Sequence, residues 1–254
     1  DPFEMDVGDV HRIREMFAIA AIQIGQTSGQ YGSALINPNN HQRLSGIEKV
    51  KRMCEITRLL GAPNTYLRPG SINPAHPWFP HKENRSPRIF DRLVDSTKKI
   101  CSAAESEGVR LAVEGGVVSP LYSATIVRDF FDAVGSKSLG FNQDPVNFVS
   151  SLEDIYDTQQ FLNNLFDVLG EFTIGAHIKD IRIVDQLVVR FEETEIGTGM
   201  MDHVTFLKLM QKSCPNAHVL IEHIKPDRFE NAVKKIEYYS RRAGITWEIN
   251  DILP

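Results

Sequence analysis

Short apolar runs alternate with helical patterns along this chain, and this alternation constrains the fold more than any other feature. Each run has the length and composition of a buried strand, and a polar loop and an amphipathic helix follow it. Strands that alternate with helices form parallel sheets covered on both faces. The predicted strands lie in seven stretches, at residues 3–7, 18–25, 64–68, 109–114, 139–144, 172–180 and 219–222.

This pattern predicts an α/β fold, and a (β/α)8 TIM barrel is the arrangement it fits best. We expect one barrel domain over residues 1–254, with the first strand and helix absent from the N-terminus of this chain. An open doubly wound sheet is the alternative, but no Gly-rich phosphate-binding turn follows a predicted strand. The predicted helices cover residues 8–17, 45–60, 87–107, 123–134, 157–169, 202–212 and 229–243, and irregular loops are expected at 26–45, 69–87 and 181–199.

Four of the predicted strands end in residue types that can hold a metal ion. Glu114, Asp144 and Glu222 close their runs, and His177 stands near the end of a fourth. The carboxyl ends of parallel barrel strands share one edge, where active sites of this fold are built. Three carboxylates and one imidazole suit a single divalent ion such as Mn²⁺, Mg²⁺, Co²⁺ or Zn²⁺. An acid at a strand end is, taken singly, more often a surface charge or a helix cap.

Such a site favours proton transfer on a small hydroxy-ketone. A metal that chelates the carbonyl and the adjacent hydroxyl acidifies the neighbouring C–H bond and stabilises an enediolate. Glu114 and Glu222 could then remove and return the proton, which gives isomerisation or epimerisation. Lys179 shares a strand face with His177, so the competing interpretation is a metal-free ion network in which Lys179 pairs with Glu114 or Glu222. His177 could equally be a core histidine.

Composition narrows the partners and the setting. The net charge of −5 gives no basic stripe for a nucleic-acid backbone. The three cysteines, Cys54, Cys101 and Cys214, are widely spaced, which indicates neither a disulfide framework nor a zinc knuckle. No apolar run is long enough to cross a membrane and no export leader is visible. We therefore expect a cytoplasmic protein with a small-molecule partner; whether it forms a homo-oligomer stays open.

The same residues resemble the sugar phosphate isomerase/epimerase superfamily, the xylose isomerase-like TIM barrels. The resemblance covers roughly the last 150 residues and is specific for the superfamily, but not for a substrate. Its matching pieces are Ala112-Val-Glu114, Gln143-Asp-Pro-Val-Asn147, His177-Ile-Lys-Asp180, Ile196-Gly-Thr-Gly199 with Asp202, and Leu220-Ile-Glu222.

The resemblance implies a barrel with one divalent metal on Glu114, Asp144, His177 and Glu222. It also implies that Lys179 contacts substrate oxygens. Ketose 3-epimerase-like members carry a substrate-touching histidine where this chain has Asn147, which can donate and accept hydrogen bonds but cannot act as an acid or base. Asn147 therefore argues against a tagatose 3-epimerase activity.

Arg68 ends its predicted strand, where it could bind a substrate carboxylate or phosphate; a structural role is the other interpretation. An inosose dehydratase-like lyase could use the same metal site, because dehydration begins with the same proton removal. An endonuclease IV-like repair enzyme and a non-catalytic sugar-binding barrel are alternatives from other classes. Substrate identity depends on the shapes of the three long loops, which the sequence does not give.

Overall fold

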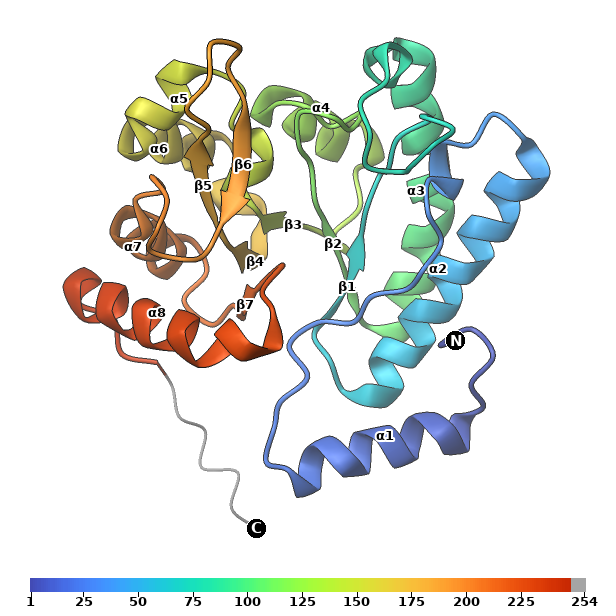
Figure 1. Cartoon of the computed structure of the whole chain (residues 1–254). Helices are drawn as coiled ribbons and strands as arrows, with labels where there is room; N and C mark the ends of the chain where they lie inside the picture. The colour runs from blue at the N-terminus through green and yellow to red at the C-terminus, as the bar shows by residue number, and fades with distance from the viewer. Residues whose placement is uncertain (248–254) are drawn as a thin grey trace. The chain divides into compact units, whose positions relative to one another are not determined.

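The computed structural model describes residues 1–247 and divides the chain into two compact units, Asp1–Asn142 and the part that begins at Gln143. Helices and strands alternate in both units, which confirms the α/β class (Figure 1). The α-helices of the described residues are α1 (Val7–Ile19), α2 (Asn40–Leu60), α3 (Pro87–Glu107), α4 (Ala124–Val134), α5 (Leu152–Tyr156), α6 (Thr158–Leu169), α7 (His203–Ser213) and α8 (Phe229–Ala243). The strands are β1 (Asn64–Leu67), β2 (Arg110–Val113), β3 (Leu139–Gln143), β4 (Thr173–Ile178), β5 (Asp180–Ile183), β6 (Phe191–Thr194) and β7 (Val219–Ile221).

The first unit is a parallel sheet with helices packed beside it. Strand β1 pairs with β2 and β2 pairs with β3, all in parallel, so their carboxyl ends lie at one edge. Helices α2 and α3 run side by side and contact β1 and β2 respectively (Figure 1). Both helices end where the sequence predicts, at residues 60 and 107, because the glycines that follow, Gly61 and Gly108, adopt the left-handed conformation that side chains disfavour.

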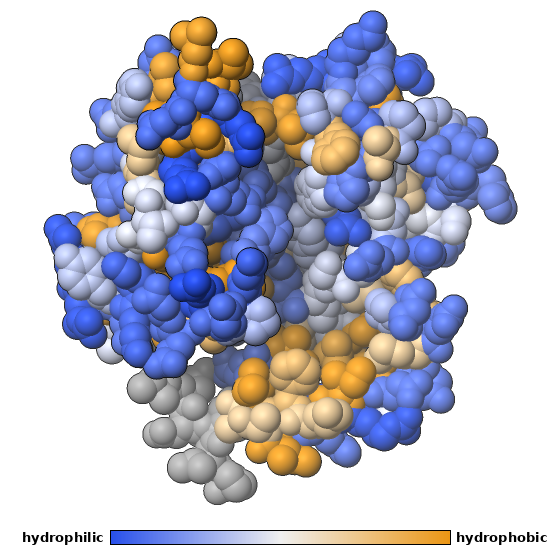
Figure 2. Space-filling model, in the orientation of Figure 1, coloured by the Kyte–Doolittle hydropathy of each residue, from blue (hydrophilic) through white to orange (hydrophobic). Residues whose placement is uncertain are grey.

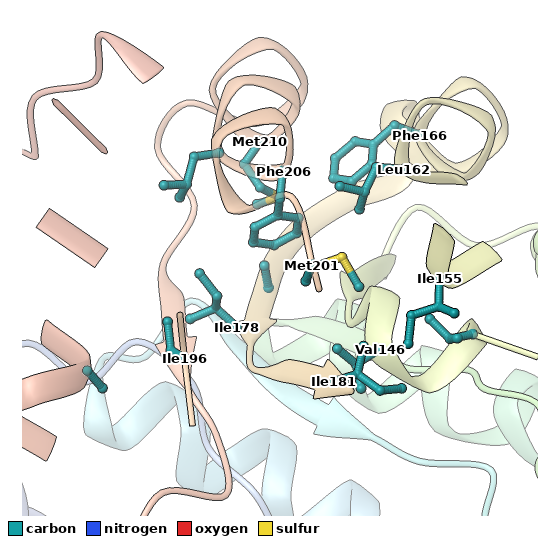
Figure 3. Packing of buried hydrophobic residues seen from close by; sticks show 14 residues of the cluster. Val146, Ile155, Leu162, Phe166, Ile178, Ile181, Ile196, Met201, Phe206 and Met210 are labelled. Carbon is teal, nitrogen blue, oxygen red and sulfur yellow. The ribbon is translucent and has the colours of Figure 1, made fainter. Parts of the chain in front are cut away.

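The second unit combines a parallel strand pair with an antiparallel hairpin. Strand β4 pairs with β7 in parallel, and β5 pairs with β6 in antiparallel register. Helices α6, α7 and α8 pack in succession. Their apolar faces meet the strands in one buried cluster that includes Leu162, Phe166, Ile178 and Phe206 (Figure 3). This core fixes β4, whose carboxyl end carries His177.

Two N-terminal predictions are wrong. Residues 3–7 and 18–25 form no strand. Helix α1 runs to Ile19, and residues 16–23 are exposed, so they lack the burial of a core strand. Asp6 starts this helix by a reciprocal capping interaction with Asp9, and the alanine-rich run that follows favours helix over strand. Figure 2 shows the resulting apolar surface over α1, to which Met16, Ile19 and Ile22 contribute.

Two loop predictions also need correction. Helix α2 begins at Asn40 rather than near Ser45, because the Asn39 side chain accepts hydrogen bonds from the backbone N–H groups of His41 and Gln42. Residues 181–199 are not irregular throughout, since they contain most of the β5–β6 hairpin. The hairpin tip is apolar and projects into solvent, with Leu187 completely exposed (Figure 2).

The described helices include none that combines the length and the apolar composition needed to cross a membrane.

Candidate functional site

Lys179 is the centre of a charged cluster at the end of β4. Ile178 packs into the core (Figure 3). Because side chains alternate along an extended chain, its neighbours His177 and Lys179 are expected to face the opposite way. The Lys179 Nζ lies 2.8 Å from Asp144 Oδ2 and 2.8 Å from Glu222 Oε2, and 3.4 Å from Glu193 Oε1. The Lys179 side chain is only 4% exposed, so three carboxylates share one buried ammonium group.

Asp144 is fully buried where β3 gives way to a short 3-10 helix, Pro145–Phe148. Its Oδ2 accepts a hydrogen bond of 2.9 Å from the Asn147 side chain. Asn147 therefore holds the same carboxylate oxygen that contacts Lys179. Pro145 favours this abrupt change of direction, because it fixes its own backbone at the first position of the 3-10 turn.

Glu222 follows β7 and joins the cluster from the neighbouring strand. Its backbone N–H donates to the carbonyl of Ile178, which fixes Glu222 beside the end of β4. Its Oε1 lies 3.4 Å from His177 Nδ1. The structure thus brings Asp144, His177, Lys179 and Glu222 together within the second unit, while their predicted roles as metal ligands, base and substrate contact stay predictions.

The charges in this cluster keep one another ionised. Burial alone would raise the pKa of Glu222, but the charge and hydrogen bond of Lys179, together with His177 and His223, outweigh it and hold that pKa below its usual range. Burial alone would lower the pKa of Lys179, yet Asp144 and Glu222 together raise it. The competing sequence interpretation, an ion pair between Lys179 and Glu222, is thus present in the structure, and Asp144 belongs to it as well.

Two further members of the cluster, Glu193 and His223, were missed by the sequence analysis. His223 Nδ1 lies 2.7 Å from Glu193 Oε2, and this contact raises the pKa of His223. Both residues line a cavity of about 320 Å³ together with Lys179 and Glu222. Glu193 lies on β6, in the stretch expected to be irregular, so no strand period pointed to it. His223 directly follows Glu222, and this adjacency was the one sequence signal that could have assigned it to the cluster.

Asp180, the residue after Lys179, serves a structural purpose. Its carboxylate accepts hydrogen bonds of 2.9–3.1 Å from the backbone N–H groups of Ile181, Gly197, Gly199 and Met201. Gly199 is required at its position, because a Cβ there would lie 2.3 Å from Asp180 Oδ1. Asp180 therefore anchors the return of the β5–β6 hairpin, and with it the strand that carries Glu193.

Glu114 belongs to the first unit, where it is buried just after β2. Tyr66 donates a hydrogen bond of 2.8 Å to one carboxylate oxygen, and the Asn142 side chain donates one of 3.0 Å to the other. Asn142 is itself oriented by Gln26. Tyr66 and Asn142 escaped the sequence analysis because each lies inside a buried strand, where a polar side chain reads only as a satisfied core residue.

Arg68 follows β1 in the first unit. Its guanidinium lies 5.1 Å from the ring centroid of Tyr31 and 5.9 Å from that of Trp78, and one of its terminal nitrogens donates to the carbonyl of Gly29. The Tyr31 ring is fixed, since its hydroxyl accepts a hydrogen bond from the Arg68 backbone N–H. Arg68 is thus held in place by aromatic rings and by backbone.

Both units carry residue types that bind a divalent metal ion. In the first unit this is buried Glu114; in the second unit these are buried Asp144 and His177, with Glu222 beside them. Within the second unit, three carboxylates face one lysine, which leaves an excess of negative charge for a cation to neutralise. Carboxylate oxygens with one imidazole nitrogen suit Mg²⁺, Mn²⁺, Co²⁺ or Zn²⁺.

Comparison with known proteins is consistent with this architecture. Solved structures similar to this chain include a xylose isomerase-like TIM barrel protein from Mycobacterium smegmatis in complex with magnesium, at 13% identity and TM-score 0.74, covering 94% of this chain and 78% of that one. A D-tagatose 3-epimerase-like protein matches at 16% identity and TM-score 0.74, covering 93% and 84%. The mannonate dehydratase from Streptococcus suis serotype2 matches at 15% identity and TM-score 0.67, covering 98% and 86%.

A search of curated proteins by sequence found no match. Residues 1–242 match the family described as the xylose isomerase-like TIM barrel, which is most of the chain. The predicted resemblance and the predicted fold are therefore confirmed, and this chain belongs to the xylose isomerase-like TIM barrel family.

Proposed function

We propose that this protein is a divalent-metal-dependent isomerase or epimerase that moves a proton on a small sugar, sugar phosphate or related polyol ketone. The observation that carries the proposal is the cluster of Asp144, His177, Lys179 and Glu222 at the ends of β3, β4 and β7, in which all but Glu222 are buried. Gathering several acids around one buried lysine costs stability, and clusters of charged groups of this kind are common at functional sites. Similarity to a D-tagatose 3-epimerase-like protein supports the same class of reaction.

Glu114, Asp144, His177 and Glu222 are the residues that would hold the metal. A divalent ion there would draw electrons from the carbonyl oxygen and the adjacent hydroxyl oxygen of the substrate. This would acidify the C–H bond of the carbon next to the carbonyl. Asn147 keeps the Asp144 carboxylate oriented through its hydrogen bond. Lys179 balances the charge of Asp144 and Glu222, and its N–H groups can also donate to a substrate oxygen.

Glu222 and Glu114 are the proposed proton carriers. The low pKa of Glu222 keeps it ionised near neutral pH, which a proton acceptor requires. Glu114 accepts hydrogen bonds from two neutral side chains, Tyr66 and Asn142, which stabilise its carboxylate. One glutamate would remove the proton and the other would return it, to the same carbon in epimerisation or to its neighbour in isomerisation.

A lyase acting on the same site is the second candidate. Dehydration needs the same proton removal and, in addition, a group that protonates the departing hydroxyl. His223 lies in the same cavity as Glu222 and could supply that proton. Similarity to mannonate dehydratase also supports this alternative.

Exchange of substrate hydrogen with solvent deuterium tests the proposal without knowledge of the product. The protein, loaded in turn with Mn²⁺, Mg²⁺, Co²⁺ and Zn²⁺, would be incubated with a panel of ketoses in D₂O and followed by NMR. We expect metal-dependent exchange at the carbon next to the carbonyl, lost by orders of magnitude in Glu114→Gln. Glu230→Gln, at an exposed glutamate of α8, is the control.

Metal and sugar binding without exchange would instead identify a non-catalytic sugar-binding barrel, and nicking of DNA at an abasic site would favour the endonuclease alternative. A protein that binds no divalent ion overturns the proposal outright.

We also propose a cytoplasmic setting, supported by the wide spacing of the three cysteines, Cys54, Cys101 and Cys214, which indicates no disulfide framework. A single barrel domain over residues 1–254 stays a prediction.

A further inference from the structure

A cavity of about 300 Å³ lies between two loops of the first unit. It is lined by residues 32, 33, 37 and 38 of one loop and by residues 71–77 of the next. Apart from His76, none of these residues carries an ionisable side chain, although charged residues make up 24% of the chain. A charged ligand would lose its water here without gaining an ionic partner from the lining residues. The cavity therefore suits a neutral, polar molecule.

Buried hydrogen bonds hold the walls of this cavity in place. The side chain of Asn84, which is 1% exposed, donates to the Ser71 hydroxyl at 2.8 Å and accepts from the Ile72 backbone N–H at 3.0 Å. The two loops also meet closely at Gly70, where an added Cβ would lie only 2.9 Å from the Cα of Ser33. The cavity is thus preformed, and a ligand that enters it does not have to order the loops first.

Two lining side chains offer hydrogen-bonding groups that no described residue takes up. The Ser33 hydroxyl makes no hydrogen bond within residues 1–247. His76 accepts a hydrogen bond of 3.2 Å at Nδ1 from the backbone N–H of Trp78, so its ring carries a hydrogen on Nε2 that it can donate. The half-exposed Phe79 ring lies 4.9 Å from the His76 ring, centroid to centroid. A sugar matches these features, because it presents hydroxyl groups at its rim and C–H groups that pack on aromatic faces.

We propose that this cavity binds a neutral carbohydrate. Ser33 and His76 hydrogen-bond the sugar hydroxyls, and the paired rings of His76 and Phe79 pack against its C–H groups. The inference goes beyond the proposed function and does not depend on it. Every residue in it belongs to the first unit, and none is a candidate metal ligand or proton carrier.

His81 is a matched control for His76 in the same loop. Its Nδ1 also accepts a hydrogen bond of 3.2 Å from the backbone N–H two residues further on, that of Glu83, but His81 does not line the cavity. Proton NMR of the histidine rings therefore measures binding and its location together. The Cε1–H signals of the two rings would be assigned by their loss in His76→Phe and in His81→Phe.

The full chain would be titrated with four neutral sugars, glucose, galactose, maltose and cellobiose, and with two charged ones, glucosamine and glucose 6-phosphate. Each titration would be run without added metal and again with Mg²⁺. The series would be repeated on Ser33→Ala and on Ala75→Trp, which places a large side chain at an exposed position of the cavity wall.

We expect at least one neutral sugar to shift the His76 signal saturably, with a Kd on the order of 1 mM, as a few neutral hydrogen bonds imply. The His81 signal should change little, Mg²⁺ should leave the Kd unchanged, and neither charged sugar should bind more tightly than the best neutral one. Binding should weaken about 3- to 10-fold in Ser33→Ala and by more than about tenfold in Ala75→Trp, and it should be unchanged in His81→Phe.

The inference is overturned if no neutral sugar shifts the His76 signal saturably, if a charged sugar binds most tightly, or if binding survives intact in Ala75→Trp. Equal shifts of the His76 and His81 signals would reveal non-specific contact and would overturn it too. If Ala75→Trp does not fold, Ser33→Ala decides the location. Absence of deuterium exchange on every ketose would refute the proposed function alone, and absence of the neutral-sugar site would refute this inference alone.

Discussion

Lys179 and Asp180 are adjacent, charged and buried, yet their surroundings differ in kind. Lys179 is bound by the side chains of Asp144, Glu193 and Glu222, whereas Asp180 is bound mainly by backbone N–H groups of the following loop. Backbone donors are fixed by the fold, so Asp180 cannot exchange them for a ligand. Side-chain partners can rotate away. A charge held by side chains therefore marks a candidate site, and a charge held by backbone marks an anchor.

Glu222→Gln is expected to have the largest effect on the reaction. Removing the proposed base should reduce deuterium exchange by about 1,000-fold, within the range for general acid–base groups. The free energy of unfolding should also fall, because glutamine removes a charge that balances buried Lys179, so exchange is compared under conditions in which both proteins are folded. Glu195→Gln, at another glutamate of the same cavity, is the control. Similar losses in both variants would contradict a specific role for Glu222.

Asp180→Ala should have the opposite profile. The loss of one carboxylate leaves several buried N–H groups without an acceptor, and we expect the free energy of unfolding to fall by about 3–5 kcal/mol. Urea unfolding followed by circular dichroism would measure this change. Asp185→Ala, at an exposed position of the same hairpin, should change stability by less than about 0.5 kcal/mol. A stable Asp180→Ala protein would remove the distinction between anchor and site.

The anchor should also be visible as a dependence of stability on pH. Burial alone would raise the pKa of Asp180, but His203 and the backbone N–H groups outweigh it and hold that pKa below its usual value. The unfolded chain then binds more protons than the folded one in the acid range. The stabilisation is complete above about pH 4 to 5 and is lost as pH falls through the folded pKa. Asp180→Asn should show a flatter acid limb in urea unfolding between about pH 5 and pH 2 than the unaltered protein; parallel curves would exclude this role.

Lys179→Met tests the site half of the comparison between Lys179 and Asp180, and we expect it to have the smallest effect. Without the ammonium group, Asp144 and Glu222 repel each other in the metal-free protein, which should become less stable. The same two acids should bind a divalent ion about tenfold more tightly, since no cation of the protein competes. Calorimetric titration with Mn²⁺ would measure the affinity. Lys208→Met, on α7, is a control that should leave it unchanged.

The sequence predicted the parts of the site that obey one simple rule. Asp144, His177, Lys179 and Glu222 follow strands that pair or neighbour in a parallel fold, so their convergence needed only the strand pattern. The pairing of Glu114 with a shared metal stays a prediction, because Glu114 lies in the other unit. Helix ends at Gly61, Gly108 and Gly244 were predictable from the conformational freedom of glycine.

The misses have physical reasons. Residues 18–25 are apolar enough for a strand, but alanine and the preceding cap carry the helix to Ile19. Glu193 reaches the cluster only because the β5–β6 hairpin forms, and His223, which follows Glu222, contacts Glu193 there; the short strands of this hairpin carry many charges. Its formation depends on the Asp180 anchor, a tertiary interaction that no local pattern reports.

The backbone of His223 lies in the left-handed region, with φ of 55°, where a residue other than glycine loses on the order of 1 kcal/mol. Selection of this protein for heat tolerance would therefore favour glycine at position 223, since glycine adopts that conformation without strain. A library screened for heat tolerance and for turnover in parallel would show a trade-off at this one codon if the imidazole serves the reaction.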